Sequence, residues 1–275
     1  MGEIDMKKEC SVAEVMSIME AWAPKRLAED WDNPGLLVGS PARRVGKIMT
    51  CLDVLESVAD EAIERDCGLI IAHHPVIFRG QKHLRTDLPL GRLLQKLLSR
   101  DIAVIAAHTN LDITEGGVND VLAGKLGLRA LQPFMITDTG DSLGRMGETE
   151  APLDLCEFAK AVRDKLGAGH VRLVRPFGNG KKPVKRVAVC SGAGGEFIDK
   201  AVLAGANVYV TGDVKYHEAR HAQELGLPVI DAGHFFTEQL IAGVIAGRVS
   251  KELARRGYEI DVREEQSSAD PFEVI

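Results

Sequence analysis

The sequence predicts an α/β protein in which helices are layered on mainly parallel sheets. Short apolar runs rich in Val and Ile alternate with segments of helical periodicity, as in successive βαβ units. Aromatic residues make up only 5% of the 275 residues, while small and aliphatic residues dominate. The hydrophobic content of 45% is sufficient for a full core, in one large domain or in two lobes.

The first half of the chain alternates strand and helix signals. Ser11, with Glu14 three residues later, forms a capping-box pattern that predicts a helix extending to about Trp22. We expect strands over residues 48–52, 68–72 and 102–107, and helices over residues 56–65, 90–99 and 118–126. Uninterrupted apolar strands of this kind are typical of parallel sheets buried on both faces.

The second half repeats this order, and the repetition favours two similar lobes. We expect strands over residues 186–190, 207–210 and 228–230, and helices over residues 152–166, 196–204 and 217–225. At a constant offset, Cys51 aligns with Cys190 and His74 aligns with Asp213. The predicted lobes are residues 1–130 and 131–275, with the Gly-rich stretch 137–144 as a hinge and the C-terminal helix packing back on the first lobe. A site lined by strand ends of both lobes would occupy the cleft between them.

Charge and cysteine content limit the class of protein. The formal net charge of −6 argues against non-specific binding to nucleic acid. The five cysteines form no C-x-x-C pair, and Cys51, Cys67 and Cys190 lie in or beside apolar runs, where reduced thiols pack as small hydrophobes. The N-terminus lacks the apolar core of a signal peptide, and no apolar run reaches about 18 residues. We therefore expect a cytoplasmic protein that does not enter a membrane.

Histidines and acids follow three of the predicted strands. They are His73 and His74 after residues 68–72, His108 and Asp112 after residues 102–107, and His234 after residues 228–230. Pro75 cannot continue a strand ladder, so the first pair lies where strand meets loop. Open α/β sheets bind their ligands at the carboxyl ends of the strands. A single His there is more often structural, but the joint pattern predicts a metal site assembled from distant segments.

The spacing of these residues suggests how they share metal ions. His234 and Glu238 lie four residues apart, one turn along a helix, and Gly233 permits a sharp entry into that helix. Adjacent residues of an extended strand point to opposite faces, so we expect His73 and His74 to serve two neighbouring ions, or only one of them to be a ligand. Five protein ligands leave two ions with coordination positions for water or substrate, as in catalytic sites.

Six motifs carry a resemblance to a known family. In order, they are WDNPGLLVG (31–39), AHHPVIF (72–78), HTNLD (108–112), GVND (117–120), TGDVKYHEA (211–219) and DAGHFFTE (231–238). Together they resemble the NGG-one-interacting-factor-three-like family, whose members are often called GTP cyclohydrolase I type 2 homologues. The resemblance implies two similar α/β lobes with a dinuclear metal centre between them, assembled as a ring-shaped homohexamer.

The resemblance also implies residue roles. His74 and Asp112 would bind one divalent ion, His73 and His234 would bind the second, and Glu238 would bridge them. Zinc, manganese, iron, cobalt and nickel all suit mixed nitrogen and oxygen ligands without thiolate.

The implied substrate is a small molecule, a purine nucleotide. We expect a dinuclear hydrolase in which hydroxide derived from bound water attacks the imidazole ring carbon of GTP. Formate is released, and dihydroneopterin triphosphate is the eventual product. His108 and His217 are the candidate catalytic proton carriers, and the resemblance places His108 beside the ligands and turns His217 toward the cleft. A two-metal phosphoesterase and a non-catalytic metal-handling or partner-binding protein are the alternatives.

Several further residues have two interpretations each. Asp213 can orient a metal ligand or cap the following helix, and Asp32 belongs to the resembling opening loop or simply to a turn. Arg79, Lys82, His83 and Arg85 are candidate phosphate contacts or ordinary loop charges, and Arg145 is a candidate anion contact.

Overall fold

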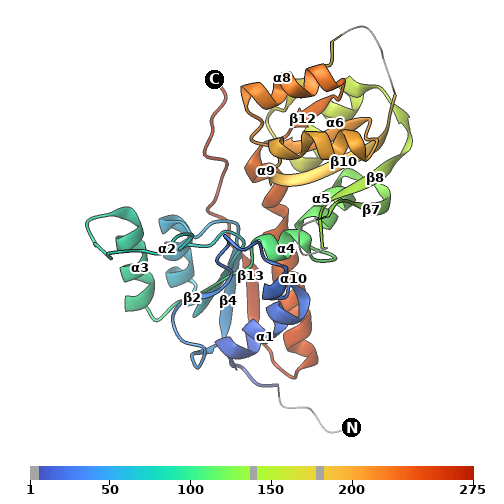
Figure 1. Cartoon of the computed structure of the whole chain (residues 1–275). Coiled ribbons are helices and arrows are strands. Elements are labelled where there is room, and N and C mark those ends of the chain that lie inside the picture. The colour runs from blue at the N-terminus through green and yellow to red at the C-terminus, as the bar shows by residue number, and fades with distance from the viewer. Residues whose placement is uncertain (1–5, 137–140, 178–182) are drawn as a thin grey trace, which may run out of the picture. The chain divides into compact units, whose positions relative to one another are not determined.

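The computed structural model describes residues 6–136, 141–177 and 183–275, and the chain forms two compact α/β units (Figure 1). Unit 1 comprises Met1–Leu111 and Ile241–Ala269, and unit 2 comprises Asp112–Leu240 and Asp270–Ile275. Each unit contains one large mixed sheet with helices packed against it. The predicted α/β class is therefore confirmed.

The sheet of unit 1 is mainly parallel, as predicted. Its five strands, in spatial order, are β13 (Asp261–Glu264), β4 (Lys47–Cys51), β5 (Leu69–Ala72), β6 (Ala103–Ala106) and β2 (Gly35–Val38). The first four run parallel, and β2 is antiparallel to β6 at the edge. A separate antiparallel pair joins β1 (Cys10–Ser11) to β3 (Arg44–Val45). Because β4, β5 and β6 are parallel, their carboxyl ends share one edge of the sheet.

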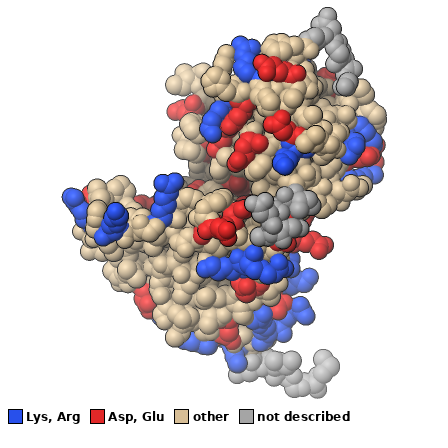
Figure 2. All heavy atoms as spheres, in the orientation of Figure 1, with Lys and Arg blue, Asp and Glu red and all other residues tan. Residues whose placement is uncertain are grey.

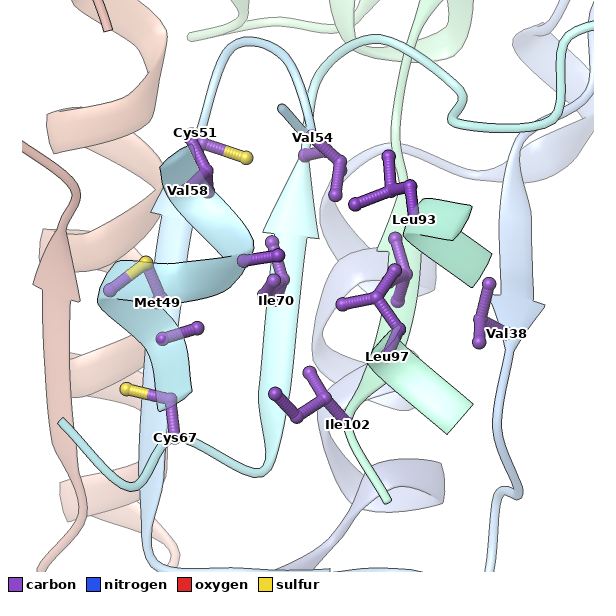
Figure 3. Packing of buried hydrophobic residues seen from close by; sticks show 14 of the residues in the cluster. Val38, Met49, Cys51, Val54, Val58, Cys67, Ile70, Leu93, Leu97 and Ile102 are labelled. Atoms are coloured by element: carbon purple, nitrogen blue, oxygen red, sulfur yellow. The ribbon is translucent and has the colours of Figure 1, made fainter. Parts of the chain in front are cut away.

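Helices cover both faces of the unit 1 sheet. They are α1 (Val12–Trp22), α2 (Glu56–Glu64), α3 (Pro89–Ser99) and α10 (Leu240–Arg255), with the short helix η1 (Lys25–Leu27) after α1. Figure 3 shows Met49 and Ile70 of the sheet packed against Val58 of α2 and Leu97 of α3. On the other face, the Thr50 hydroxyl donates to a backbone carbonyl in α10 over 2.8 Å.

The first helix begins as its sequence predicts. The Ser11 hydroxyl accepts from the Glu14 amide over 3.2 Å, and the Glu14 carboxylate accepts from the Ser11 amide over 2.7 Å. This reciprocal capping box satisfies two backbone donors that the helix cannot satisfy itself. The predicted apolar thiols are also confirmed, since Cys51, Cys67 and Cys190 are all buried and none forms a disulfide.

The sheet of unit 2 is less parallel than predicted. Its six strands, in spatial order, are β7 (Arg129–Ile136), β8 (Ser142–Leu153), β10 (Val184–Ala193), β11 (Val208–Gly212), β12 (Val229–Asp231) and β9 (Arg172–Val174). Only β10, β11 and β12 are parallel, while β7, β8 and β9 join them antiparallel. The expectation of a mainly parallel sheet is wrong here because β7 and β8 become strands by pairing antiparallel with each other, and β8 also pairs antiparallel with β10.

The last residues of the predicted hinge, 142–144, lie in strand β8. Residues 137–140 lie outside the described residues, but the strands on either side of them pair antiparallel within unit 2. Met135 pairs with Leu143, and the register continues to Pro133 opposite Arg145. A polar, Gly-rich stretch is typical of a hairpin connection as well as of a linker, and local composition does not distinguish the two.

Successive side chains of β10 point to opposite faces of the sheet, so the core of unit 2 has two layers. Val187 and Val189 pack with α5 (Val118–Leu126) and α6 (Leu155–Leu166), whereas Ala188 and Cys190 pack with α7 (Ile198–Leu203) and α8 (Tyr216–Leu225). The remaining helical segments are α4 (Thr109–Ile113), η2 (Gly195–Phe197) and α9 (His234–Glu238). Helix α6 starts later than predicted because Asp154 caps it, accepting from the amide of Cys156 over 2.8 Å. Among the described residues, no helix combines the length and apolarity needed to cross a bilayer.

Candidate metal-binding residues

Unit 1 gathers three histidines at the carboxyl edge of its sheet. His73 and His74 follow β5 directly, and His108 lies two residues beyond β6. One ring nitrogen of each lies within 4.8 Å of the others, which is close enough for neighbouring metal ligands. His73 is completely buried, and the other two side chains are mostly buried. Parallel pairing of β5 with β6 brings these distant segments together, as the strand-end argument predicts.

The two adjacent histidines do not point to opposite faces, in contrast to the prediction. The ring centroids of His73 and His74 are 5.0 Å apart, and the ring planes are inclined by 40°. Side-chain alternation holds only within a regular strand, and β5 ends at Ala72. Two imidazoles arranged in this way can each bind one of two closely spaced ions.

Each of these imidazoles is anchored through Nδ1 to an oxygen atom. His73 Nδ1 donates to the Ala107 carbonyl over 2.8 Å, and His74 Nδ1 donates to Asp53 Oδ1 over 2.8 Å. Because both acceptors are oxygens, the proton resides on Nδ1, and Nε2 is the nitrogen that would coordinate a metal ion. Orienting partners of this kind are characteristic of metal-binding histidines. Sequence reasoning missed Asp53, although its position just beyond β4, on the same edge, was a usable signal.

A buried carboxylate fixes His108. Asp32 accepts from His108 Nδ1 over 2.8 Å and from the Thr109 hydroxyl over 2.6 Å, and its side chain has no exposed surface. Burial alone would raise the pKa of Asp32, but the hydrogen bonds from His108 and Thr109 outweigh it and lower the pKa to about 2. Asp32 is therefore an ionised acceptor in a dyad with His108, and not merely part of a turn.

Unit 2 places His234 and Glu238 on the short helix α9. His234 Nε2 lies 2.9 Å from Glu238 Oε2, so one ion can contact both side chains. Gly233 has a φ of +83°, which gives the sharp entry into the helix that the sequence predicts. His234 Nδ1 donates to Asp213 Oδ2 over 2.8 Å, so Asp213 orients this imidazole, as one of its two interpretations proposed. Asp213 itself has a φ of +53°, a conformation that Asp tolerates better than most residues.

Unit 2 also brings two buried carboxylates together. Asp112 and Glu238 are 8% and 4% exposed, and an oxygen of each lies within 4.8 Å of the other. Two ionised carboxylates at this separation and burial repel each other unless a cation or a proton lies between them. Burial raises the pKa of the nearby Cys190 thiol, and the charges of Asp112 and Glu238 raise it further.

Close contacts surround the backbone of Asp112 and the side chain of Glu238. Asn119 donates through Nδ2 to the Asp112 carbonyl over 3.1 Å and accepts from the Ser191 amide over 2.9 Å. Gly192 has a φ of +61°, and a Cβ at this position would lie 2.2 Å from a carboxylate oxygen of Glu238. The glycine is therefore required by both the backbone conformation and the close approach of Glu238.

Two other predicted residues have different surroundings. His217 is exposed near the start of α8 and lies outside the donor clusters found among the described residues. Arg145, a candidate anion contact, is buried, pairs with Asp120 and donates to backbone carbonyls. The N–H groups of its guanidinium are therefore already bonded to acceptors within unit 2, and the interpretation as an anion contact is wrong.

The donor chemistry of both units fits a divalent metal ion. Imidazole nitrogens and carboxylate oxygens are ligands for zinc and for the neighbouring transition metals, and the thiols of Cys51 and Cys190 are packed in hydrophobic clusters. Fold and donor residues together define an α/β protein with clustered His, Asp and Glu side chains that can bind metal.

The chain belongs to the Duf34/NIF3 (NGG1p interacting factor 3) family, whose pattern matches residues 10–271. A relative from Clostridium acetobutylicum, named GTP cyclohydrolase 1 type 2 homolog, is 34% identical over 266 residues, which span 95% of this chain and 97% of the relative. The solved structure of a Bacillus cereus protein related to NIF3 matches with a TM-score of 0.92 at 26% identity, covering 98% of this chain and 100% of that protein. A Staphylococcus aureus hypothetical protein matches with a TM-score of 0.85 at 31% identity, covering 96% and 99% of the two chains. The family resemblance inferred from the six motifs is confirmed.

Proposed function

We propose that this chain is a dinuclear metal-dependent hydrolase that acts on a purine nucleotide, with GTP as the first candidate. The observation that carries the proposal is the pair of donor clusters, one in each unit, at the carboxyl edges of parallel strands. The imidazoles of His74 and His234 are each held in one orientation by an aspartate oxygen 2.8 Å from Nδ1, as expected of metal ligands. The candidate substrate is taken from the name of the relatives, GTP cyclohydrolase 1 type 2 homolog.

The proposed ligand assignment follows the family resemblance. His74 and Asp112 would hold one ion, His73 and His234 would hold the other, and Glu238 would be a ligand of both. The 5.0 Å separation of the His73 and His74 ring centroids is compatible with ligands of two neighbouring ions.

Divalent ions in these positions would activate water and stabilise the negative charge that develops during hydrolysis. The protein's own contribution is orientation and proton transfer. Asp53 and Asp213 hold the imidazoles of His74 and His234 in one tautomer. The Asp32–His108 dyad keeps the His108 Nδ1 proton in place, so that Nε2 can accept or return a proton during formate release from GTP.

Metal analysis of the purified protein tests the binding site. We expect about two ions per chain, lost in part or completely in the His74→Ala and His234→Ala variants. His221→Ala is the matched control, because His221 is 46% exposed and pairs with Asp199 on the surface of unit 2. Full retention of both ions in the His74→Ala and His234→Ala variants would refute the shared centre, and full retention in Glu238→Gln would refute the bridge.

The role of His108 is tested separately from metal binding. If His108 is a proton carrier, His108→Gln retains both ions and lowers the hydrolysis rate by roughly 10²- to 10⁴-fold. Loss of an ion from this variant would make His108 a ligand. His217, the second candidate proton carrier, receives the same comparison, and an unchanged rate in His217→Gln removes it from the mechanism.

Product analysis separates the proposed reaction from its alternatives. Formate released from GTP supports cyclohydrolase chemistry, whereas phosphate released from nucleotides or simple phosphoesters supports a two-metal phosphoesterase. Absence of both products in the fully metal-loaded protein would favour a metal-handling or partner-binding role. The proposal also includes the homohexamer implied by the resemblance, for which sedimentation analysis of the full chain is the test.

A further inference from the structure

Two large aromatic side chains are exposed beside His108 in unit 1. Trp31 is 60% exposed and Phe78 is 41% exposed, although rings of this size contribute most to stability when buried. Their centroids lie 6.0 Å and 6.1 Å from the His108 ring. Apolar surface that remains exposed next to a functional residue is characteristic of a binding site.

The three rings form a corner rather than a stack. The planes of Trp31 and Phe78 are inclined by 58° with centroids 5.8 Å apart, and both rings meet His108 nearly edge-on, at 76° and 79°. Since the indole and the phenyl ring are not stacked on each other, an incoming planar ring can lie against the face of one and the edge of the other. Offset-stacked and edge-to-face contacts are the geometries that aromatic pairs prefer.

Hydrogen bonds hold this corner in position. Asp32, next to Trp31, has a fully buried carboxylate that accepts from the Thr109 amide and hydroxyl. Asn33 Nδ2 donates to the Ile77 carbonyl over 2.6 Å and thereby ties the Trp31 loop to the Phe78 loop. Two exposed rings whose backbones are fixed in this way lose little further entropy when a ligand binds.

Cationic side chains follow the second ring directly. Arg79 and Lys82 lie in the exposed loop before α3 and form no ion pair recorded among the described residues, whereas Arg85 pairs with Asp87. Figure 2 shows Lys and Arg side chains gathered over the part of unit 1 that Figure 1 labels α3. An anionic group on the ligand would therefore meet positive charge on this side of the corner.

We propose that Trp31 and Phe78 are the specificity-determining residues of the site, a platform that stacks a planar heteroaromatic ring carrying an anionic group. The platform holds that ring beside the histidines of unit 1. This inference rests on the proposed function and names the residues that bind the substrate's base.

Tryptophan fluorescence provides a direct test. Trp31 and Trp22 are the two tryptophans of the chain, and Trp22 is only 5% exposed, so quenching by a stacked ring reports on Trp31. We expect saturable quenching by guanosine 5′-monophosphate and none by ribose 5-phosphate, in zinc-loaded and in chelator-treated protein alike. No quenching by the nucleotide would overturn the proposal.

Variants measured by calorimetry identify the residues. We expect Trp31→Leu and Phe78→Leu each to weaken nucleotide binding by at least about fivefold, and Trp31→Phe to recover most of the loss. Phe177→Leu is the matched control, because Phe177 is a 63% exposed aromatic residue in unit 2. Equal weakening in the control, or unchanged binding in both platform variants, contradicts the inference.

The outcomes separate this inference from the proposed function. Quenching in a protein that fails to bind zinc when zinc is supplied would leave the platform standing and refute the metal-dependent hydrolase. Zinc binding without quenching would refute the platform and leave the hydrolase standing. Trp31→Leu is expected to sediment like the original chain. If Trp31→Leu has a different oligomeric state and the nucleotide does not quench the original chain, these rings contact a second copy of the chain, and the platform is overturned.

Discussion

Replacing Arg145 by Met is expected to destabilise unit 2 by about 3 kcal/mol. The Arg145 guanidinium makes a bidentate pair with Asp120, at 2.5 Å and 3.1 Å, and its side chain is only 9% exposed. It also donates to the backbone carbonyls of Ile113, Thr114, Ser142 and Gly144. Breaking a buried pair by removing one partner costs about 3–5 kcal/mol. The lower end applies because the remaining carboxylate is 20% exposed and can hydrate in part.

Hydrogen exchange measures this loss in unit 2 alone. About 3 kcal/mol corresponds to a roughly 150-fold larger population of the open state, so amides of β8 and β10 should exchange faster by that factor. Amides of β4 and β5 in unit 1 are the internal reference, and their exchange should change much less.

Arg129→Met is the matched control. Arg129 lies in the same β7–β8 hairpin and pairs with Glu150 over 3.0 Å, but the two side chains are 68% and 75% exposed. An exposed pair contributes at most about 1 kcal/mol. If Arg145→Met accelerates exchange by less than about tenfold, or no more than Arg129→Met does, the reasoning from burial is refuted.

Three further predictions follow from the other contacts. Asp213→Ala should weaken zinc binding by about 10- to 100-fold in a chelator competition, since it removes the hydrogen-bond partner of His234, a proposed ligand, and an unchanged affinity would contradict the assignment. Gly192→Ala should lower both the zinc affinity and the melting temperature, because its Cβ would lie 2.2 Å from Glu238; a variant with both values intact would disprove the close approach. The pKa of Glu14 is lowered from 4.5 to about 2, first by the Tyr258 hydroxyl and then by a backbone amide. Its stabilisation is therefore complete above pH 4.5 and is lost as the pH falls toward 2, so urea unfolding of Glu14→Gln should depend less on pH in that window, and an unaltered pH profile would count against it.

Local sequence was sufficient where an element is defined by its own residues. The capping pattern at Ser11 predicted the start of α1, and the apolar run after Gly68 predicted β5 with His73 at its end. The same reasoning failed at the β7–β8 hairpin, where polar residues form strands because they pair with each other and with β10. Strand propensity is weak without the neighbouring strand, so these segments carry little signal of their own.

Burial and orientation at the candidate site likewise depended on distant partners. Neither Asp53 nor Asp32 is near its imidazole in the sequence, although each lies 2.8 Å from Nδ1 in the fold. Arg145 has the charge of an anion contact, and only its enclosure within unit 2 shows that its donors are already used.

The amino-acid order alone determined the α/β class, the strand ends that carry the histidines and the family to which the chain belongs. The tertiary structure decided which carboxylate orients each imidazole, how close the adjacent His73 and His74 rings lie, and which charges are buried. The physical reason is that periodicity and capping act over a few residues, whereas these contacts arise from pairing between strands far apart along the chain.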